Sequence, residues 1–458
     1  MESRKQRLII TPLVLLLLAS LFFAPAGAHD EATPGLHPVI LLPGYSCSQL
    51  DARLTDEYEP PTPACGVAKQ GRGWFRLWEN YTALQVDPTL LPCFHDQLRL
   101  VYDRAAGDYR DAPGVETRVV SFGTTRSFRF DDPTLKCIRE VHRRAELAVL
   151  QQHPLCSPAG GARLHRRRSR GRSRSGLAAC CAFASVEVTA QYDFRYAPAA
   201  PGVAAWSFAG FRASLKPLVE RASETNGDKP VILVSHSFGA FYATQFIDRS
   251  PLPWRTRYLK HFVMLCAGGS GSPGIMQVLA STMGTSPPTR LAMFGDRSFE
   301  SALSTFPSPE VYGDTPLVVT RAKNYTAENI PEFLATVGFS DEEVERYRRR
   351  AMPLTRSFKA PIVAMTSING VGVPTVDKIV YWDGNFTEKP QVVNGDGDGA
   401  INLKTVLALE KLVGDDPDQR YFKSVLVPNT THSGMISDVS ALRIVVSEIL
   451  EANLATSG

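Results

Sequence analysis

The sequence lacks a strong excess of charge of either sign, any internal repeat and, beyond its first 28 residues, any apolar run long enough to cross a bilayer. Its 458 residues carry 50 Lys and Arg against 46 Asp and Glu, and 44% are hydrophobic. This ordinary globular composition excludes a disordered tail protein, a collagen-like repeat and a coiled coil. The small positive excess comes from residues 157–176, which hold seven Arg and no acid. A nucleic-acid partner therefore has little support.

The first 28 residues have the pattern of a cleavable signal peptide. Arg4, Lys5 and Arg7 give a positive start, residues 8–23 are apolar, and Ala26-Gly27-Ala28 is a small-residue cleavage motif. An uncleaved signal anchor is the alternative, but the apolar stretch has 16 residues, whereas a span needs roughly 20. The sequence predicts a mature chain, residues 29–458, in the secretory pathway, either extracellular or vacuolar.

Cysteines and glycosylation motifs fit this compartment. The chain has eight Cys, which an oxidising compartment allows to pair as disulfides. Four N-x-S/T motifs predict a glycoprotein, and they stand at Asn80, Asn324, Asn385 and Asn429.

Short apolar runs alternate with helical patterns along most of the chain. This order indicates a mostly parallel sheet with helices on both faces. The predicted strands are 38–42, 231–234, 261–266 and 361–365, and the predicted helices are 135–151, 241–247, 401–412 and 439–454. Residues 268–350, rich in Gly, Pro and Ser with scattered helical pattern, are predicted to form a cap over this core.

Residues 157–183 form an atypical Arg-rich insertion. The run holds Arg, Ser and Gly and is followed by Cys180-Cys181. Three interpretations are open: a basic linker or polyanion-binding patch, a disordered loop, or translated non-coding sequence.

Ser237 is the candidate nucleophile. The residues Val231-Ile-Leu-Val-Ser235-His236-Ser237-Phe238-Gly239 predict a strand, a sharp turn and a helix start. A nucleophile elbow needs this arrangement, with small residues two before and two after the nucleophile. Ser235 and Gly239 are both small, although Ser235 stands where glycine is usual. A Ser/Gly turn without catalytic function is the alternative.

The candidate base follows from the order of the triad, which in this fold is Ser, acid, His. Only two of the nine His come after Ser237. His261 begins a predicted strand too early to follow an acid from a later strand. His432 lies in a loop before the last helix and is the candidate base.

The acid comes from the segment Val392-Val-Asn-Gly-Asp396-Gly-Asp398-Gly399, a strand that ends in a Gly-rich turn. An Asp there can hold the His in one tautomer, and Asp396 and Asp398 compete for this role. The segment also looks like a calcium loop, but position twelve would be Thr405 instead of Glu. We therefore expect no metal and no cofactor.

Four segments resemble the lecithin–cholesterol acyltransferase family, and above all its plant lecithin–cholesterol acyltransferase-like branch. Their order and spacing match over nearly all of residues 35–450. The segments are Pro38–Leu50, which resembles the first strand and oxyanion turn; Tyr192-Asp-Phe-Arg195, similar to a Tyr-Asp-Trp-Arg signature; Lys229–Ser237, the elbow; and Gly397-Asp398-Gly399, the acid turn.

The resemblance implies an α/β-hydrolase fold with a disulfide-tethered lid loop and a cap insertion. It favours Asp398 over Asp396, and it implies an oxyanion hole from the backbone N–H groups of Tyr45 and Phe238. It also implies that Cys65 and Cys93 close a lid loop, residues 65–93. Trp74, Phe75 and Trp78 in this loop suit a lipid–water interface, although packing inward is the alternative; these positions are read from the sequence.

The sequence departs from the family pattern in three places. Cys266 is the only Cys after the elbow, so the family's second disulfide cannot form. Tyr45 and Ser46 replace the usual small pair. Residues 157–190 are expected to replace the strand and turn that precede Tyr192 in the family.

The activity implied by the resemblance is lipid O-acyl transfer. The partners would be a phospholipid in a membrane or lipid-particle surface and an acceptor, which is an alcohol such as a sterol. Transfer to water, as in a phospholipase A, uses the same triad and stays open. An inactive lipid-binding glycoprotein is the interpretation from another class.

Overall fold

The computed structural model describes residues 36–66, 73–78, 80, 86–124, 186–267, 271–281, 296–356 and 359–455. Residues 37–458 group as one compact unit and residues 1–36 as another. The predicted signal peptide, the predicted helix at 135–151 and the Arg-rich insertion lie outside the described residues. Within the described ranges, no helix is long and apolar enough to cross a membrane.

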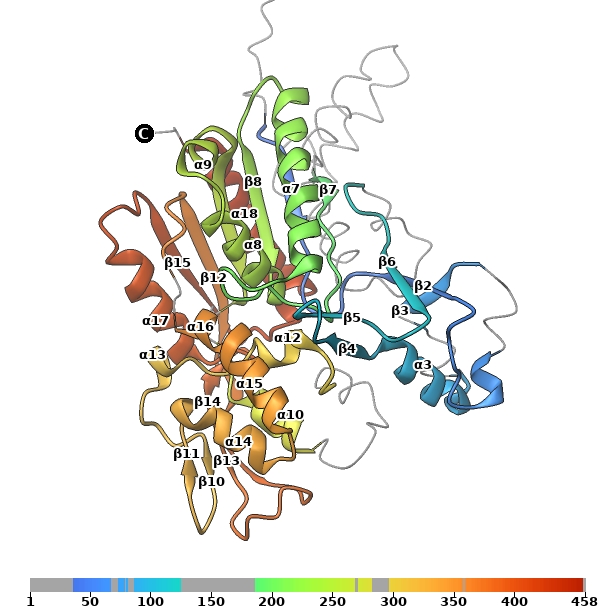
Figure 1. Ribbon diagram of the computed structural model, residues 1–458. Helices are drawn as coiled ribbons and strands as arrows, with labels where there is room; N and C mark the ends of the chain where they lie inside the picture. The colour runs from blue at the N-terminus through green and yellow to red at the C-terminus, as the bar shows by residue number, and fades with distance from the viewer. Residues whose placement is uncertain are drawn as a thin grey trace, which may run out of the picture. The chain divides into compact units, whose positions relative to one another are not determined.

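A six-stranded sheet forms the centre of the larger unit (Figure 1). Its strand order is β15-β12-β9-β8-β1-β7, and every pairing within it is parallel. The strands are β1 (Val39–Leu42), β7 (Val186–Thr189), β8 (Val231–His236), β9 (Leu259–Leu265), β12 (Met365–Val371) and β15 (Phe422–Pro428). The prediction of a mostly parallel sheet is confirmed.

Alternate residues of the central strands face opposite sides of this sheet. On β8, Val231 and Leu233 join the larger hydrophobic core, and Ile232 and Val234 join a second core. Helices α7 and α8 contact β8 and contribute to the larger core, whereas α18 supplies the second one. A strand buried on both faces has to be apolar at every position, as residues 231–234 are.

The helices that flank the sheet follow its strands closely. α8 comes directly after β8 and α9 precedes β9, as short connections in an α/β fold require. The flanking helices are α7 (Trp206–Thr225), α8 (Phe238–Asp248), α9 (Leu252–Tyr258), α17 (Leu403–Gly414), η7 (Gly434–Ile436) and α18 (Val439–Leu454).

Within residues 271–281 and 296–356, short helices predominate, and the assignment of this region as a cap stays a prediction. The helices are α10 (Gly274–Ser281), α12 (Glu300–Leu303), α13 (Pro309–Tyr312), η6 (Ala327–Asn329), α14 (Ile330–Thr336), α15 (Asp341–Arg350) and α16 (Met352–Thr355). The same region has two short strands, β10 (Val318–Val319) and β11 (Asn324–Tyr325). These join β13 (Val373–Val380) and β14 (Gln391–Gly397) in a four-stranded sheet of order β11-β10-β13-β14.

The region after β1 contains two small antiparallel sheets. β2 (Leu50–Leu54) lies between β3 (Phe75–Trp78) and β6 (Val115–Val119), and β4 (Leu100–Asp103) pairs with β5 (Asp108–Asp111). The short helices here are η1 (Pro63–Gly66), η3 (Pro88–Leu90) and α3 (Leu91–Leu98). Cys65 of η1 and Cys93 of α3 form a disulfide across 28 residues of sequence, which confirms the predicted pairing.

Two predictions about strands were wrong. The strand before Tyr192 is present as β7, which pairs with β1, so the insertion does not replace it. In the sequence, the four residues of β7 come shortly after the Arg-rich insertion, and no local pattern marks the boundary between the two. The strand predicted at 361–365 begins only at Met365, because Pro361 and its neighbours form the preceding turn.

Candidate active site

Ser237 stands at the sharp turn between β8 and α8. Its φ and ψ are 53° and −127°, which is a strained conformation for a residue with a side chain and is typical of nucleophile elbows. The turn is tight: a Cβ atom added at Gly239 would lie 2.3 Å from the main-chain oxygen of Pro43. Ser235, the other small residue, is buried. The strained turn presents the Ser237 hydroxyl at the carboxyl end of the sheet.

His432 lies beside this hydroxyl. It follows β15 in the loop before η7, and its Nε2 is 2.8 Å from Oγ of Ser237. Its Nδ1 is 2.8 Å from Oδ2 of Asp398, and its main-chain N–H donates to the carbonyl of the same Asp at 2.7 Å. Because Asp398 accepts from Nδ1, Nε2 is left to take a proton from the serine.

Asp398 follows β14 and is only 2% exposed. Its Oδ1 accepts hydrogen bonds from the N–H groups of Ala400 at 2.9 Å and Ile401 at 2.7 Å. Burial by itself would raise the pKa of Asp398. The hydrogen bond and charge of His432, together with the two N–H groups, outweigh burial and hold the pKa below its ordinary value. The carboxylate therefore stays ionised.

The competing Asp396 points elsewhere. It is exposed, and its Oδ1 accepts from the N–H of Gly372 at 2.6 Å. The two carboxylates are two residues apart at the end of β14, but they contact different parts of the protein. The structure thus brings Ser237, His432 and Asp398 together and leaves Asp396 out.

The turn after β1 and the start of α8 flank Ser237. A Cβ atom added at Gly44 would lie 3.2 Å from Cβ of Ser237, so the turn touches the nucleophile. The ring of Tyr45 packs against the ring of Phe238, with centroids 5.8 Å apart. Phe238 begins α8, where main-chain N–H groups have no acceptor within the helix. Both predicted oxyanion donors belong to segments beside the serine.

The aromatic residues of the predicted lid divide between surface and interior. Trp78 is 4% exposed, and its indole N–H donates to the main-chain oxygen of Ser46 at 2.7 Å. The interpretation of this residue as a contact with lipid was wrong, because its polar atom is satisfied inside. Trp74 is 36% exposed, and the guanidinium groups of Arg53 and Arg118 lie over its ring, 5.3 Å and 4.2 Å from the centroid.

Sequence reasoning missed two groups beside the triad. His236 donates from Nε2 to the main-chain oxygen of His432 at 3.1 Å. Its position directly before Ser237 in the sequence could have identified it as part of the site. Cys266, fully buried after β9, has its sulfur within 4.8 Å of ring nitrogens of both His236 and His432. Three such atoms could face a metal ion, but the ring nitrogens of His432 already contact Asp398 and Ser237. We assign no metal to them.

The four glycosylation motifs lie in accessible or partly accessible positions. Asn324, Asn385 and Asn429 are exposed, and Asn80 is half-buried. Glycosylation at these residues stays a prediction. Asn429 lies three residues before His432, so a glycan there would begin close to the site.

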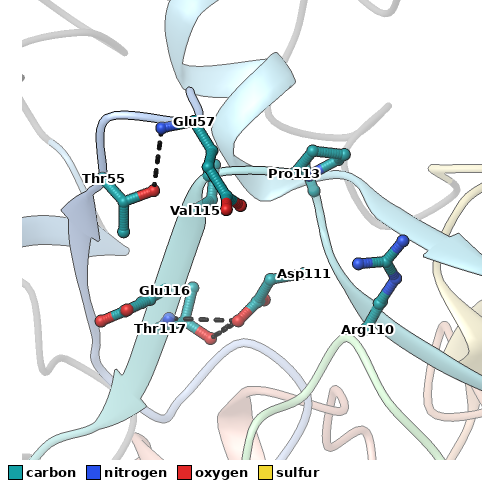
Figure 2. Close-up of a pocket in the computed structure, with 10 residues that line it drawn as sticks. Thr55, Glu57, Arg110, Asp111, Pro113, Val115, Glu116 and Thr117 are labelled. Carbon is teal, nitrogen blue, oxygen red and sulfur yellow. Dashed lines mark hydrogen bonds between the residues drawn. The ribbon is translucent and has the colours of Figure 1, made fainter. Parts of the chain in front are cut away.

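A polar pocket of about 450 Å³ lies apart from the triad (Figure 2). Residues 110–117 line it together with Thr55 and Glu57. Among these residues, Asp111 accepts hydrogen bonds from the main-chain N–H and the hydroxyl of Thr117. None of the three triad residues lines this pocket.

The parallel sheet, the strained elbow and the hydrogen-bonded Ser, His and Asp define a serine-dependent α/β-hydrolase. Residues 185–347 match the family model described as lecithin:cholesterol acyltransferase. Lecithin-cholesterol acyltransferase-like 1 of Oryza sativa subsp. japonica is 38% identical over 96% of this chain and 91% of its own. The protein of that name from Arabidopsis thaliana is 34% identical, with 90% of each chain covered. The chain belongs to the lecithin:cholesterol acyltransferase family.

Two further comparisons extend this result. The human lysosomal phospholipase A and acyltransferase is 28% identical over 94% of this chain and 93% of its own. Among solved structures, the Tle4–Tli4 complex contains a chain with a TM-score of 0.50, 12% identity and coverage of 92% of this chain and 99% of its own. At that identity the likeness concerns the fold alone, and it agrees with the α/β-hydrolase architecture.

Proposed function

We propose that the protein moves a fatty acyl chain from a glycerophospholipid, through an acyl-enzyme on Ser237, to an alcohol such as a sterol. The observation that carries this proposal is the continuous set of hydrogen bonds from Ser237 through His432 to Asp398. It stands in a chain related along nearly its whole length to acyltransferases of lipids.

The first half of the reaction forms the acyl-enzyme. Nε2 of His432 takes the hydroxyl proton while Oγ of Ser237 attacks the ester carbonyl. Main-chain N–H groups of Tyr45 and Phe238 stabilise the oxyanion. The tetrahedral intermediate then collapses, the bond to the glycerol oxygen breaks, and the lysophospholipid leaves with the proton from His432. Asp398 orients the ring and stabilises its charged form throughout.

The second half reverses these roles. His432 takes the proton of the acceptor hydroxyl, whose oxygen attacks the acyl carbonyl on Ser237. When the intermediate collapses, the new ester leaves and Ser237 regains its proton. Nothing in the triad distinguishes an alcohol from water, so a phospholipase A is the second candidate. Its specific support is the similarity to an enzyme named for both activities.

Substrate delivery and location form a separate part of the proposal. We infer that the tethered lid loop, residues 65–93, contacts a membrane or lipid-particle surface, supported by the exposed Trp74 and the two guanidinium groups over its ring. The lysosomal relative and the predicted signal peptide support a place in the secretory pathway, extracellular or vacuolar. Sedimentation with phosphatidylcholine vesicles, comparing wild type with Trp74→Ala, tests the lid. Retention of equal binding by the variant would contradict the role of this residue.

The decisive experiment measures acyl products. Purified protein is incubated with phosphatidylcholine carrying a labelled acyl chain, with and without sterol, and the products are separated. Labelled sterol ester supports the transferase, and labelled free fatty acid supports the phospholipase. The Ser237→Ala variant should form neither, with a loss of about 10^6 in kcat. An inactive wild-type protein that still binds phospholipid would support a lipid-binding glycoprotein instead.

A further inference from the structure

Tyr192 makes a buried hydrogen bond to the turn that flanks the nucleophile. Its side chain is 2% exposed, and its hydroxyl donates to the main-chain oxygen of Pro43 at 2.9 Å. That oxygen belongs to the peptide linking Pro43 to Gly44, directly before Tyr45. Burial raises the pKa of Tyr192 well above its ordinary value, so the hydroxyl keeps the proton that it donates.

The same residue also holds the far end of this turn. The main-chain N–H of Tyr192 donates to Oγ of Ser48 at 3.2 Å. Between these two points the turn closes on itself, since the N–H of Cys47 donates to the carbonyl of Gly44 at 3.2 Å. One residue therefore fixes residues 43–48 at both ends.

The position of Tyr192 is itself strongly determined. Its ring stacks on the ring of Tyr242, with centroids 3.9 Å apart. Three residues further on, the fully buried guanidinium of Arg195 pairs with Asp193 at 2.6 Å and with Asp111 at 2.7 Å. A buried charge that is paired on two sides resists displacement, because moving it would leave the charges unpaired. The segment 192–195 is thus a firm support for the turn.

Pro43 is the point where the turn meets the elbow. Its main-chain oxygen accepts from Tyr192 and lies where a Cβ at Gly239 would clash, at 2.3 Å. Oxyanion donors have to lie within about 3.1 Å of the developing charge, and a misplaced donor loses its effect. Only the two backbone dihedrals of Gly44 separate this peptide from the one that carries the N–H of Tyr45, so holding the first restricts the directions open to the second.

We propose that Tyr192 is a positioning residue that holds the oxyanion turn through its hydroxyl. This inference rests on the proposed function of Ser237 and deepens it. Removing the hydroxyl frees the carbonyl of Pro43 to rotate, which weakens oxyanion stabilisation without removing a substrate contact. We expect Tyr192→Phe to lower kcat about tenfold, a fraction of the 10^2–10^3 lost when a donor is deleted, and to leave KM nearly unchanged.

Tyr242→Phe is the matched control. Tyr242 is also fully buried, and its hydroxyl donates to the main-chain oxygen of Tyr196 at 3.0 Å, with a longer contact of 3.4 Å to that of Asp193. Both variants delete one buried hydroxyl and keep the stacked rings. A merely structural role would lower Tm similarly in both and affect activity similarly. The positioning role lowers kcat in Tyr192→Phe alone.

A second measurement separates this inference from the identity of the substrate. A fluorophosphonate reacts with Ser237 and places its phosphoryl oxygen at the oxyanion donors, whatever lipid the enzyme uses. Slower labelling of Tyr192→Phe, with Tyr242→Phe labelled at the wild-type rate, supports the inference even if no acyl transfer from phospholipid is found. Equal labelling rates in wild type and both variants, or equal slowing in the two variants, would overturn it.

Discussion

Nε2 of His236 lies 3.1 Å from the main-chain oxygen of His432, so the elbow and the loop that carries the base are joined beside the triad. A carbonyl oxygen has no proton, so His236 donates from Nε2 and keeps a lone pair on Nδ1. That Nδ1 atom is buried and has no hydrogen-bond partner within the described residues. Burial lowers the pKa of His236 to about 3; the charge of His432 acts in the same direction, and the hydrogen bond to the main-chain oxygen of His432 opposes it only in part. The ring of His236 is therefore neutral in the folded protein.

Stability should fall in mild acid. His261, on β9, is a second such residue, and burial lowers its pKa to about 4. Below about pH 6.5 the unfolded chain protonates both rings, whereas the folded chain does not until their lowered pKa values are reached. The unfolded state then binds more protons, so the free energy of unfolding decreases as pH falls from about 6.5 toward 4. Each ring contributes at most about 1.4 kcal/mol per pH unit.

Urea unfolding at about pH 7, 6 and 5 measures this slope. His261→Gln is the suitable comparison, because it lies away from the triad and keeps a polar group near Thr366, which His261 contacts at 2.8 Å. The variant should show a shallower dependence on pH than wild type. Identical slopes would contradict the prediction.

Asp398→Asn should be far more damaging than Asp396→Asn. An Asn at 398 cannot stabilise charged His432 and favours the wrong tautomer, which costs about 10^4 in kcat for a comparable triad. Asp396 is exposed and contacts only main chain at 2.6 Å, so its variant should stay near wild type. Initial rates of acyl release decide between them, and the reverse ranking would assign the acid to Asp396.

Gly44→Ala should disable the site without unfolding the protein. The added Cβ would lie 2.7 Å from Nδ1 of His236 and 3.2 Å from Cβ of Ser237, which forces the turn away from the elbow. A shift of about 1 Å in a catalytic group can cost 10^2 in rate, and we expect a loss of that order. Gly210→Ala on α7 is the control, since nothing lies within 4 Å of its added Cβ.

The disulfide should stabilise the fold measurably. Cys65 and Cys93 enclose 28 residues of sequence, and the chain-entropy model assigns such a loop roughly 3–4 kcal/mol. The double variant Cys65→Ala/Cys93→Ala should unfold at lower urea concentration by a corresponding amount. Peptide mapping without reductant should recover the two peptides joined. Finding Cys65 joined to Cys137, or either Cys as a thiol, would contradict the assignment.

Local patterns in the sequence allowed the elbow to be predicted. Its apolar strand, its small residues at 235 and 239 and its helix are continuous in the chain, so neighbouring residues determine the turn. His432 could be found because the order of the triad left one suitable histidine. The choice between Asp396 and Asp398 was different: the residues alone left it open, and it depends on burial at the end of β14.

Tertiary packing explains what the sequence did not predict. β7 has only four residues, and it becomes a strand by pairing with β1. Trp78 ends β3, in a segment rich in aromatic residues. Its indole is buried, and the indole N–H donates to the carbonyl of Ser46. The sequence could not indicate the proposed role of Tyr192, because the acceptor of its hydroxyl, the carbonyl of Pro43, lies 149 residues away in sequence.

Deleting residues 157–183 should reduce neither catalysis nor stability. The seven Arg between 157 and 176 have no acidic neighbours in that run, and like charges that repel one another stay solvated. The strand that completes the sheet, β7, begins only at Val186, so the deletion spares its pairing with β1. Acyl transfer rates and Tm of the shortened protein should be at least those of the full chain. Transcript sequencing would show whether the segment is encoded. A deletion that lost vesicle binding or activity would instead mark the Arg-rich run as a genuine contact with a membrane or partner.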